Sequence, residues 1–473
     1  MGKIRLRHVI AWIVVLSVIG LSLSEEALSL WTTPSQFRTT VDASEQWQRK
    51  FPERLLRHVT MEMHRVHPGG TSPVTNGDAS DGIAASTMEQ TGRYQVTLRW
   101  LGFLPVKQMT VDVVPPVRLL PGGQSIGVML HAQGVIVVGQ APIIDEQGQK
   151  QYPAKASGLA VGDVIQKVGG QWVHSDAELA RVIDEAGKKG GLVDIEYVRH
   201  GETLRGQVTP VRCGETKRFR VGLFVRDRAA GVGTLTFYDP ASGLYGALGH
   251  VINDADTNQR IDVAEGRVIP AWIKGIQPGR QGMPGEKIGI FQEEESARFN
   301  GTILRNTSVG IFGRMSGKVT NTLYQEPLPI ALASQVREGP AEILTVVDGE
   351  QIERFTIEIE RVLLNRSDGK GLVIRVTDQR LLQTTGGIIQ GMSGSPIIQD
   401  GRLVGAVSHV FVNSPTTGYG SLIEKMVEES GLWQSGERQV GVLPLRQNFF
   451  FRFPWKRQKN FMAEKPFMLY KHT

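Results

Sequence analysis

The sequence contains a single cysteine, Cys213, among 473 residues. One thiol cannot form an internal disulfide, a Cys-x-x-Cys motif or a cysteine-based zinc site. Long apolar runs are also missing, because no stretch of 18 apolar residues occurs after the first 30 positions. This excludes a protein with several membrane-spanning helices. Hydrophobic residues make up 40% of the chain, which is enough to form cores and excludes a wholly disordered protein.

The main part of the chain has no excess of basic charge. The net charge is +6, and the segment after residue 436 holds eight Lys or Arg residues against two acids. The rest of the chain is therefore neutral, and we predict no nucleic-acid partner. The tail, residues 432–473, joins these basic residues to an aromatic run at 449–455. Such a composition suits an anionic membrane surface, although an extension without a role explains it equally well.

The N-terminus has the composition of a targeting segment. Basic residues at positions 3, 5 and 7 precede the apolar residues 9–23. We predict a secretory signal, or an uncleaved signal anchor, over residues 1–30. Residues 31–93 contain a helix-like pattern at 44–63 and many turn-forming residues at 68–82, and we predict a flexible, membrane-proximal segment there.

Residues 94–211 are predicted to form a β-hairpin followed by a peptide-binding domain. The run Pro-Ala-Lys-Ala-Ser-Gly-Leu-Ala-Val-Gly-Asp-Val-Ile at 153–165 closely resembles the core motif of PDZ domains. Upstream, four residues match the loop with which PDZ domains bind a peptide carboxylate: Ser125, Ile126, Gly127 and Val128. Backbone N–H groups of such a loop would hold the peptide while a strand edge pairs with it. A purely structural role for these residues is the alternative.

Residues 212–431 are rich in glycine and in short alternating segments, which predicts a β-barrel or a pair of barrels. Ser393 lies between glycines in the run Gly391-Met-Ser-Gly-Ser-Pro. A tight turn of this kind exposes a serine hydroxyl, and the N–H groups of Gly391 and Ser393 can stabilise an oxyanion. Ser395 is the competing nucleophile, but Pro396 restricts its backbone.

A serine nucleophile needs a base and a group that orients the base. Only two histidines occur between residues 212 and 430. His250 follows a glycine at a strand end, whereas His409 lies inside an alternating apolar strand and fits a structural role better. The acid is predicted among Asp378, Asp254 and Asp256, and spacing alone does not choose between them.

Four stretches, residues 232–240, 245–252, 339–346 and 386–398, resemble the SpoIVB peptidase family of endospore-forming bacteria. The resemblance extends from about residue 101 to residue 431. It implies a mainly β protein in which a PDZ domain is followed by a chymotrypsin-like serine peptidase domain. It also implies His250, Asp378 and Ser393 as the catalytic residues. We predict no metal and no cofactor.

The resemblance further implies a role in sporulation signalling. Such a peptidase would be exported from the forespore into the space between its two membranes. It would trim its own N-terminal segment and cleave a membrane-bound regulator of an intramembrane metalloprotease, so that the mother-cell sigma factor is activated. The PDZ domain would bind the chain's own N-terminal segment, and residues 1–30 would provide the membrane contact. The alternative is a PDZ adaptor with a non-catalytic barrel, which the intact set of candidate catalytic residues disfavours.

Overall fold

The computed structural model describes residues 35–43, 59–67, 70–73, 90–291, 299–364, 366 and 368–433. The chain divides into two compact units between Val117 and Arg118. The predicted targeting segment, residues 1–30, and the tail from residue 434 onward lie outside the described residues. Within the described ranges, no helix is long and apolar enough to cross a membrane.

The first unit is built on one five-stranded sheet. Its elements are β1 (Gln36–Thr40), η1 (Val41–Ala43), β2 (Val59–His67), β3 (Gly70–Pro73), β4 (Gly92–Trp100) and β5 (Leu104–Val114). The spatial order of the strands is β1-β5-β4-β2-β3, with β1 parallel to β5. Alternate side chains of β2, β4 and β5 form the core, where Met63 lies opposite Val96.

Strands β1, β2 and β3 correct the prediction of a flexible segment over residues 31–93, as far as this segment is described. Residues 59–63, expected in a helix, begin β2. Val59 and Met63 are four residues apart, and this spacing places two side chains on one face of a helix or of a strand alike. This segment forms a strand because it pairs with β4, some 30 residues later in the chain. The predicted boundary at residue 94 falls inside β4.

The second unit contains a first barrel that closes through strands far apart in the sequence. Its ring consists of β7 (Ser125–Gln140), β18 (Val263–Gln277), β20 (Phe299–Thr307), β21 (Gly310–Gly317), β17 (Leu244–Ala247) and β16 (Leu223–Tyr238). The pairing of β7 with β16 closes the ring. Three short strands attach to it: β6 (Arg118–Pro121), β19 (Glu286–Phe291) and β22 (Leu328–Pro329).

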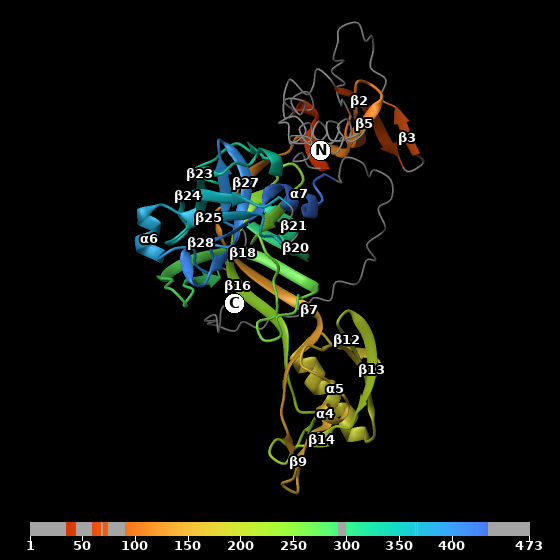
Figure 1. Cartoon of the computed structure of the whole chain (residues 1–473). Helices are drawn as coiled ribbons and strands as arrows, with labels where there is room; N and C mark the ends of the chain where they lie inside the picture. Colours follow the sequence, from red (N-terminus) through yellow and green to blue (C-terminus); the bar gives the residue numbers. More distant parts are fainter. Residues whose placement is uncertain are drawn as a thin grey trace, which may run out of the picture. The chain divides into compact units, whose positions relative to one another are not determined.

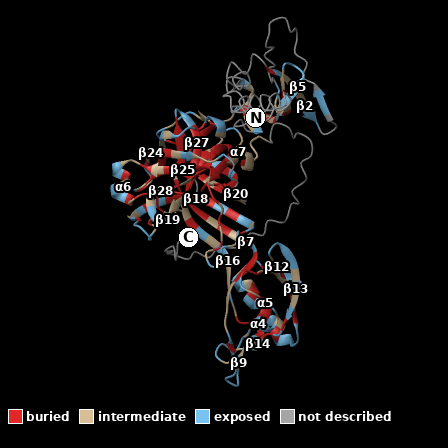
Figure 2. Cartoon of the chain, in the orientation of Figure 1, coloured by how far each residue is buried: buried red, intermediate tan, exposed pale blue. Residues whose placement is uncertain are grey.

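The second barrel is contiguous in sequence. Its closed ring has the order β23 (Gly339–Val346), β24 (Ile352–Val362), β25 (Leu372–Val376), β28 (Ser414–Leu422), β27 (Arg402–Phe411) and β26 (Pro396–Gln399). A short 3-10 turn, η4 (Ala333–Gln335), precedes it, α6 (Gln379–Thr385) follows β25, and α7 (Ile423–Ser430) follows β28. Buried residues, red in Figure 2, concentrate along β25 and β27.

The PDZ domain is inserted into the first barrel between β7 and β16 (Figure 1). Its elements are β8 (Ile143–Ile144), β9 (Lys150–Gln151), α4 (Pro153–Ala156), β10 (Val164–Val168), β11 (Gln171–Trp172), α5 (Asp176–Lys189), β12 (Val193–Arg199), β13 (Glu202–Val208), β14 (Val211–Arg212) and β15 (Phe219–Arg220). The far ends of β7 and β16 complete its core. Residues 118–132 therefore belong to the peptidase barrel, which differs from the predicted start of the peptidase domain at residue 212.

Candidate active site

Ser393 lies in a tight turn between α6 and β26. Gly391 and Gly394 have φ angles of 90° and 95°, a conformation that glycine adopts without steric cost. The Ser393 hydroxyl donates to the C=O of Ser408 at 3.0 Å. Ser393 is 8% exposed, whereas Ser395 is 0% exposed and its hydroxyl has no partner among the described residues. The structure therefore favours Ser393 over Ser395 as the nucleophile.

Two N–H groups of this turn are available to a ligand. The N–H groups of Gln390, Met392 and Gly394 donate to main-chain carbonyls. For the N–H groups of Gly391 and Ser393, by contrast, the described part of the chain provides no acceptor. These are the two donors predicted for the oxyanion hole, and unpaired N–H groups beside the nucleophile are what such a site requires.

His250 comes from the first barrel, directly after β17. Leu248 and Gly249 both have a φ of 70°, a conformation that costs a leucine on the order of 1–3 kcal/mol and is typical of functional sites. The turn lies close to β27, since a Cβ on Gly249 would be 2.9 Å from the Val407 oxygen. These two residues thus place His250 beside the second barrel.

The protonation state of His250 follows from its contacts. Its Nδ1 lies 2.7 Å from the Val251 carbonyl oxygen. A carbonyl only accepts, so Nδ1 carries the proton and Nε2 is left as an acceptor. Burial lowers the pKa of His250, and the bond to Val251 only partly opposes this effect. The imidazole is therefore a neutral base at physiological pH.

His409 lies next to His250, which the sequence did not indicate. The two ring centroids are 5.2 Å apart with planes tilted by 47°. Burial, followed by the neighbouring His250 and Lys370, lowers the pKa of His409 to about 3. Its Nδ1 is 3.1 Å from the hydroxyl of Ser408, the residue whose carbonyl binds Ser393. Ser393, His409 and His250 are thus gathered around one stretch of β27.

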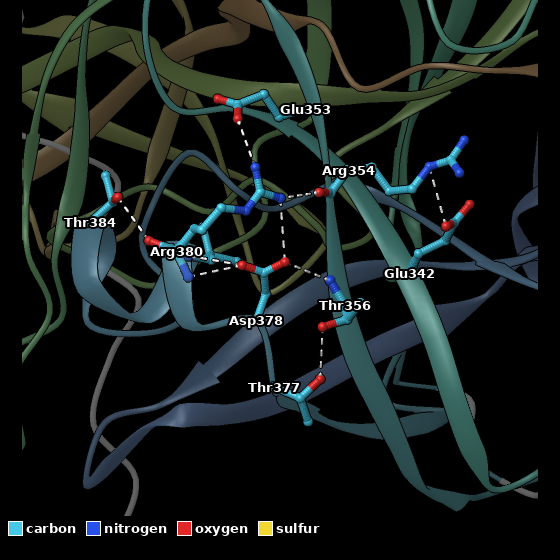
Figure 3. A network of polar contacts seen from close by, with 9 residues as sticks. Glu342, Glu353, Arg354, Thr356, Thr377, Asp378, Arg380 and Thr384 are labelled. Carbon is cyan, nitrogen blue, oxygen red and sulfur yellow. Dashed lines mark hydrogen bonds and ion pairs between the residues drawn. The ribbon is translucent and has the colours of Figure 1, made fainter.

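Asp378 does not join this group. Its carboxylate caps α6 by accepting the N–H groups of Arg380 and Leu381, and it also contacts the Thr356 N–H and the Arg380 guanidinium (Figure 3). Burial raises its pKa, but the hydrogen bonds to Leu381, Thr356 and Arg380 together hold the pKa below its usual value. None of these contacts reaches a histidine. The structure therefore gives Asp378 the role of a helix cap in place of the predicted orienting acid.

The other two acid candidates are also engaged elsewhere. Asp254 is 1% exposed and accepts hydrogen bonds from Asp256 and Thr257 within its own turn. Arg226 forms ion pairs with both Asp254 and Asp256, at 3.2 and 2.6 Å. In the resting geometry the orienting contact of His250 is thus the Val251 carbonyl, and no aspartate contact to this ring is found among the described residues.

The predicted carboxylate-binding loop is a strand. Ser125, Ile126, Gly127 and Val128 begin β7 and are all buried. They pair with β16 on one side, and three of them pair with β18 on the other. Both edges of this strand are occupied, so no peptide can add there, and the prediction of a peptide-binding turn is wrong. The short pattern Ser-Ile-Gly-Val fits a buried barrel strand as well as a loop.

A buried lysine lies against the nucleophile turn and was not predicted. Lys287 on β19 is 4% exposed, and a Cβ on Gly391 would lie 3.0 Å from its side-chain carbons. Its Nζ donates to Thr345 Oγ1 at 2.7 Å. Burial lowers the pKa of Lys287 to about 7. A lone lysine in a strand is normally solvent-facing, so no sequence signal identified it.

In the described ranges no three His, Cys, Asp or Glu side chains gather as a metal site would need.

Comparison with known proteins gives two family matches. Residues 217–427 match the family described as SpoIVB peptidase S55, and residues 125–209 match the PDZ domain family. The peptidase domain belongs to the SpoIVB peptidase S55 family. The chain is thus a serine peptidase that carries a PDZ domain. No curated protein matches the chain significantly.

Three solved structures illustrate the similarity to single domains. A PDZ domain of an SdrC-like protein from Listeria monocytogenes is 22% identical and covers 20% of this chain and 87% of its own, with a TM-score of 0.16. The active form of a protease from M. tuberculosis is 16% identical over 45% of this chain and 78% of its own, with a TM-score of 0.26. The thermostable serine protease AL20 from an extremophilic microorganism is 14% identical, covering 44% and 93%, with a TM-score of 0.27. At these scores the matches carry no weight for function.

The S55 peptidase domain extends beyond its family match at the N-terminal side. β6 and the first half of β7 precede residue 217, yet they pair with β16 and β18 and contribute Ile126, Val128 and Leu130 to the core of the first barrel. The PDZ match begins at residue 125, so it overlaps this part of the barrel. Strand β7 is therefore shared by the S55 peptidase and the PDZ domain.

Proposed function

We propose that the chain is a serine endopeptidase of sporulation signalling. In this proposal it is exported from the forespore into the space between the two membranes and trims its own N-terminal segment. It then cleaves a membrane-bound regulator of an intramembrane metalloprotease, which activates the mother-cell sigma factor. The peptidase family supports the enzymatic part, and the family name supports the link to sporulation. The observation that carries the enzymatic part of the proposal is the Ser393 turn beside a neutral histidine pair, with two N–H groups that find no acceptor in the described part of the chain.

The mechanism follows from these contacts. Ser393 attacks the peptide carbonyl, and Nε2 of His250 accepts its proton, because Nδ1 is held by the Val251 carbonyl. The N–H groups of Gly391 and Ser393 stabilise the negative oxygen of the tetrahedral intermediate. In the resting geometry the Ser393 hydroxyl donates to Ser408. It therefore has to leave that carbonyl before attack, and substrate binding is the event that displaces it.

The PDZ domain is proposed to bind the chain's own N-terminal segment until cleavage releases it. The contact through residues 125–128 is excluded, as described above. Strand β16 offers another edge: in the described residues, its part from Leu223 to Arg228 pairs only with β7. An extended peptide could add to this edge beside α5. A short tether would keep its effective concentration near millimolar.

The proposed function is tested with the full chain and two matched serine variants. Full-length wild type should be labelled by a fluorophosphonate at Ser393 and should release N-terminal fragments that mass spectrometry identifies. Ser393→Ala should lose both properties, whereas Ser395→Ala should keep most of both, because the Ser395 hydroxyl has no hydrogen-bond partner in the described structure. A wild-type protein that folds but takes no label would instead support the PDZ adaptor.

The sporulation role needs a separate measurement. In an endospore-forming host that lacks its own SpoIVB-type peptidase, the wild-type chain should restore a reporter of the mother-cell sigma factor, and Ser393→Ala should not. Fragments of the membrane-bound regulator should accumulate only with the active enzyme. A labelled, active enzyme that restores no reporter would refute the signalling role and leave the peptidase intact.

A further inference from the structure

The nucleophile turn is attached to the first barrel by two threonines of β16. Thr234 Oγ1 donates to the Gly391 carbonyl at 2.7 Å, and Thr236 Oγ1 donates to the Gly394 carbonyl at 2.8 Å. The Thr234 N–H also donates to the Ser393 carbonyl at 2.9 Å. Three hydrogen bonds therefore join one strand of the first barrel to the turn that carries the serine of the second.

The packing around these bonds is tight. Thr234 and Thr236 are both 0% exposed, and residues two apart on a strand share one face. A Cβ on Gly394 would lie only 2.0 Å from the Thr234 carbonyl oxygen. Buried hydroxyl groups normally require a partner, and a valine would fill the same volume without one. The hydrogen bonds to the serine turn thus explain why threonine, and not valine, occupies these two buried positions.

The two threonines hold different parts of the turn. The Gly391 carbonyl belongs to the peptide group between Gly391 and Met392, which lies between the two peptide groups that carry the oxyanion N–H donors. In the described structure the Gly391 carbonyl accepts its hydrogen bond from the Thr234 hydroxyl. The turn beyond the serine is held independently, because the N–H groups of Gly394 and Ser395 donate to the carbonyls of Val407 and Met392 at 2.7 and 2.9 Å.

We propose that Thr234 is a positioning residue that fixes the oxyanion hole from the opposite barrel, and that Thr236 is not needed for this. The proposal rests on the proposed function, because it takes the Gly391 and Ser393 N–H groups to be the oxyanion donors. Loss of the Thr234 hydroxyl removes the bond to the carbonyl of this central peptide group, which in the described structure is then held only through its N–H, by the bond from Met392 to the Ile389 carbonyl. The two donors then no longer keep a fixed orientation in the transition state, while substrate binding is unaffected.

The test compares Thr234→Val with Thr236→Val in the full chain. Both variants remove one buried hydroxyl bound to a carbonyl at nearly the same distance, so both should lower the unfolding temperature by similar amounts. Thr234→Val should reduce the rate of fluorophosphonate labelling and kcat for a p-nitrophenyl ester by about 10- to 100-fold, part of the 10²–10³ that a lost oxyanion donor costs. KM and the pH midpoint of labelling should not change. Thr236→Val should stay within about threefold of wild type.

The conservative variant completes the test. Thr234→Ser keeps the hydroxyl and should recover at least a third of the wild-type rate. If Thr234→Val does not fold, Thr234→Ala removes the hydroxyl without adding volume and is labelled in its place. Equal labelling rates for the Thr234 and Thr236 variants, or a wild-type rate for Thr234→Val, would overturn the positioning role alone. A folded wild type that takes no label would overturn the proposed function, and the positioning role with it.

Discussion

The two six-stranded barrels of the peptidase domain close in different ways. The second barrel is made by residues 339–422 in one continuous stretch. The first barrel needs β7 and β16, and the PDZ domain separates the barrel parts of these two strands. In the proposed mechanism, the second barrel supplies the nucleophile and both oxyanion donors from one short turn. In the same proposal, the first barrel supplies the base, His250, and it also contains Thr234, which is hydrogen-bonded to this turn.

Because of this difference, the part of the site on the first barrel depends more on residues distant in the sequence than the serine turn on the second barrel does. The backbone conformation of the serine turn depends on its own glycines, Gly391 and Gly394, although Thr234 and Thr236 of the first barrel bond to its carbonyls. The contribution of the first barrel depends on β16, which pairs with the PDZ part of β7 at Leu223 and contacts the serine turn at Thr234. Strand β16 therefore connects the PDZ domain with the Ser393 turn, whereas no described strand of the second barrel's ring pairs with a strand of the PDZ domain.

Removing the base from the first barrel should have the most severe effect. We expect His250→Ala to reduce fluorophosphonate labelling by about 10⁴-fold or more, because a serine of ordinary pKa is unreactive without a base. His409→Ala should cost no more than about tenfold, since the ring packs on His250 but has no bond to Ser393 in the described structure. Labelling rates at pH 7.5 measure both. The reverse order of the two variants would move the base to the second barrel.

The pH dependence of labelling should identify the same histidine. Burial lowers the pKa of His250, and only the neutral imidazole accepts a proton, so the rate should rise with pH through a midpoint below about 6.5. His409 has a pKa of about 3 and stays neutral over this range. His409→Gln should therefore keep the midpoint, with the folded fraction checked by circular dichroism at each pH. A midpoint at or above 6.5 would contradict the buried, carbonyl-held base.

The sequence predicted the second barrel better than the first for a physical reason. The Gly391-Met-Ser-Gly turn is local, so its conformation can be predicted from its own glycines and serine. The peptide-binding assignment to residues 125–128 failed because a short apolar run with one glycine fits a loop or a strand, and only the pairing with β16 and β18 decides. Thr234 and Lys287 gave no signal either, because their roles come from contacts more than 100 residues away.

The acid was the least predictable member of the site. The family resemblance pointed to Asp378, fifteen residues before the serine, and the structure uses the same carboxylate to start α6. The sequence around Asp378 does not distinguish a capping aspartate from an orienting aspartate, because only the contacts of the folded carboxylate differ. The PDZ domain was recognised correctly from its core motif. Its insertion into the barrel depends on pairing that no local motif encodes.

A substitution of Lys287 tests the contact between β19, which pairs with the first barrel, and the serine turn. Its pKa is about 7, so between about pH 7 and 10.5 the unfolded chain binds a proton that the folded chain does not. Stability should therefore rise with pH in this window. Lys287→Met keeps the alkyl contact with Gly391 and removes the buried amine. We expect it to raise the unfolding temperature by roughly 5 °C at pH 6, with a gain that shrinks towards pH 10.

Thermal unfolding at several pH values measures this effect. Lys274→Met serves as the control, because Lys274 is an exposed lysine on the neighbouring strand β18. It should change the unfolding temperature by less than about 1 °C at every pH. A gain for Lys287→Met that does not vary with pH would mean that the charge of the amine is not responsible for the difference.

Asp378 lies wholly within the second barrel, and we expect the smallest effect on the rate there. Asn is as good an N-cap as Asp, so Asp378→Asn should keep the bond to the Arg380 N–H, the unfolding temperature and, within about threefold, the labelling rate. Asp378→Ala removes the cap and should cost about 1 kcal/mol of stability, again with little effect on labelling at 25 °C. If Asp378→Asn stays folded but labels several orders of magnitude more slowly, the carboxylate turns towards His250 during catalysis. That outcome would give the second barrel the orienting acid as well as the nucleophile, and the base would be the only catalytic side chain from the first.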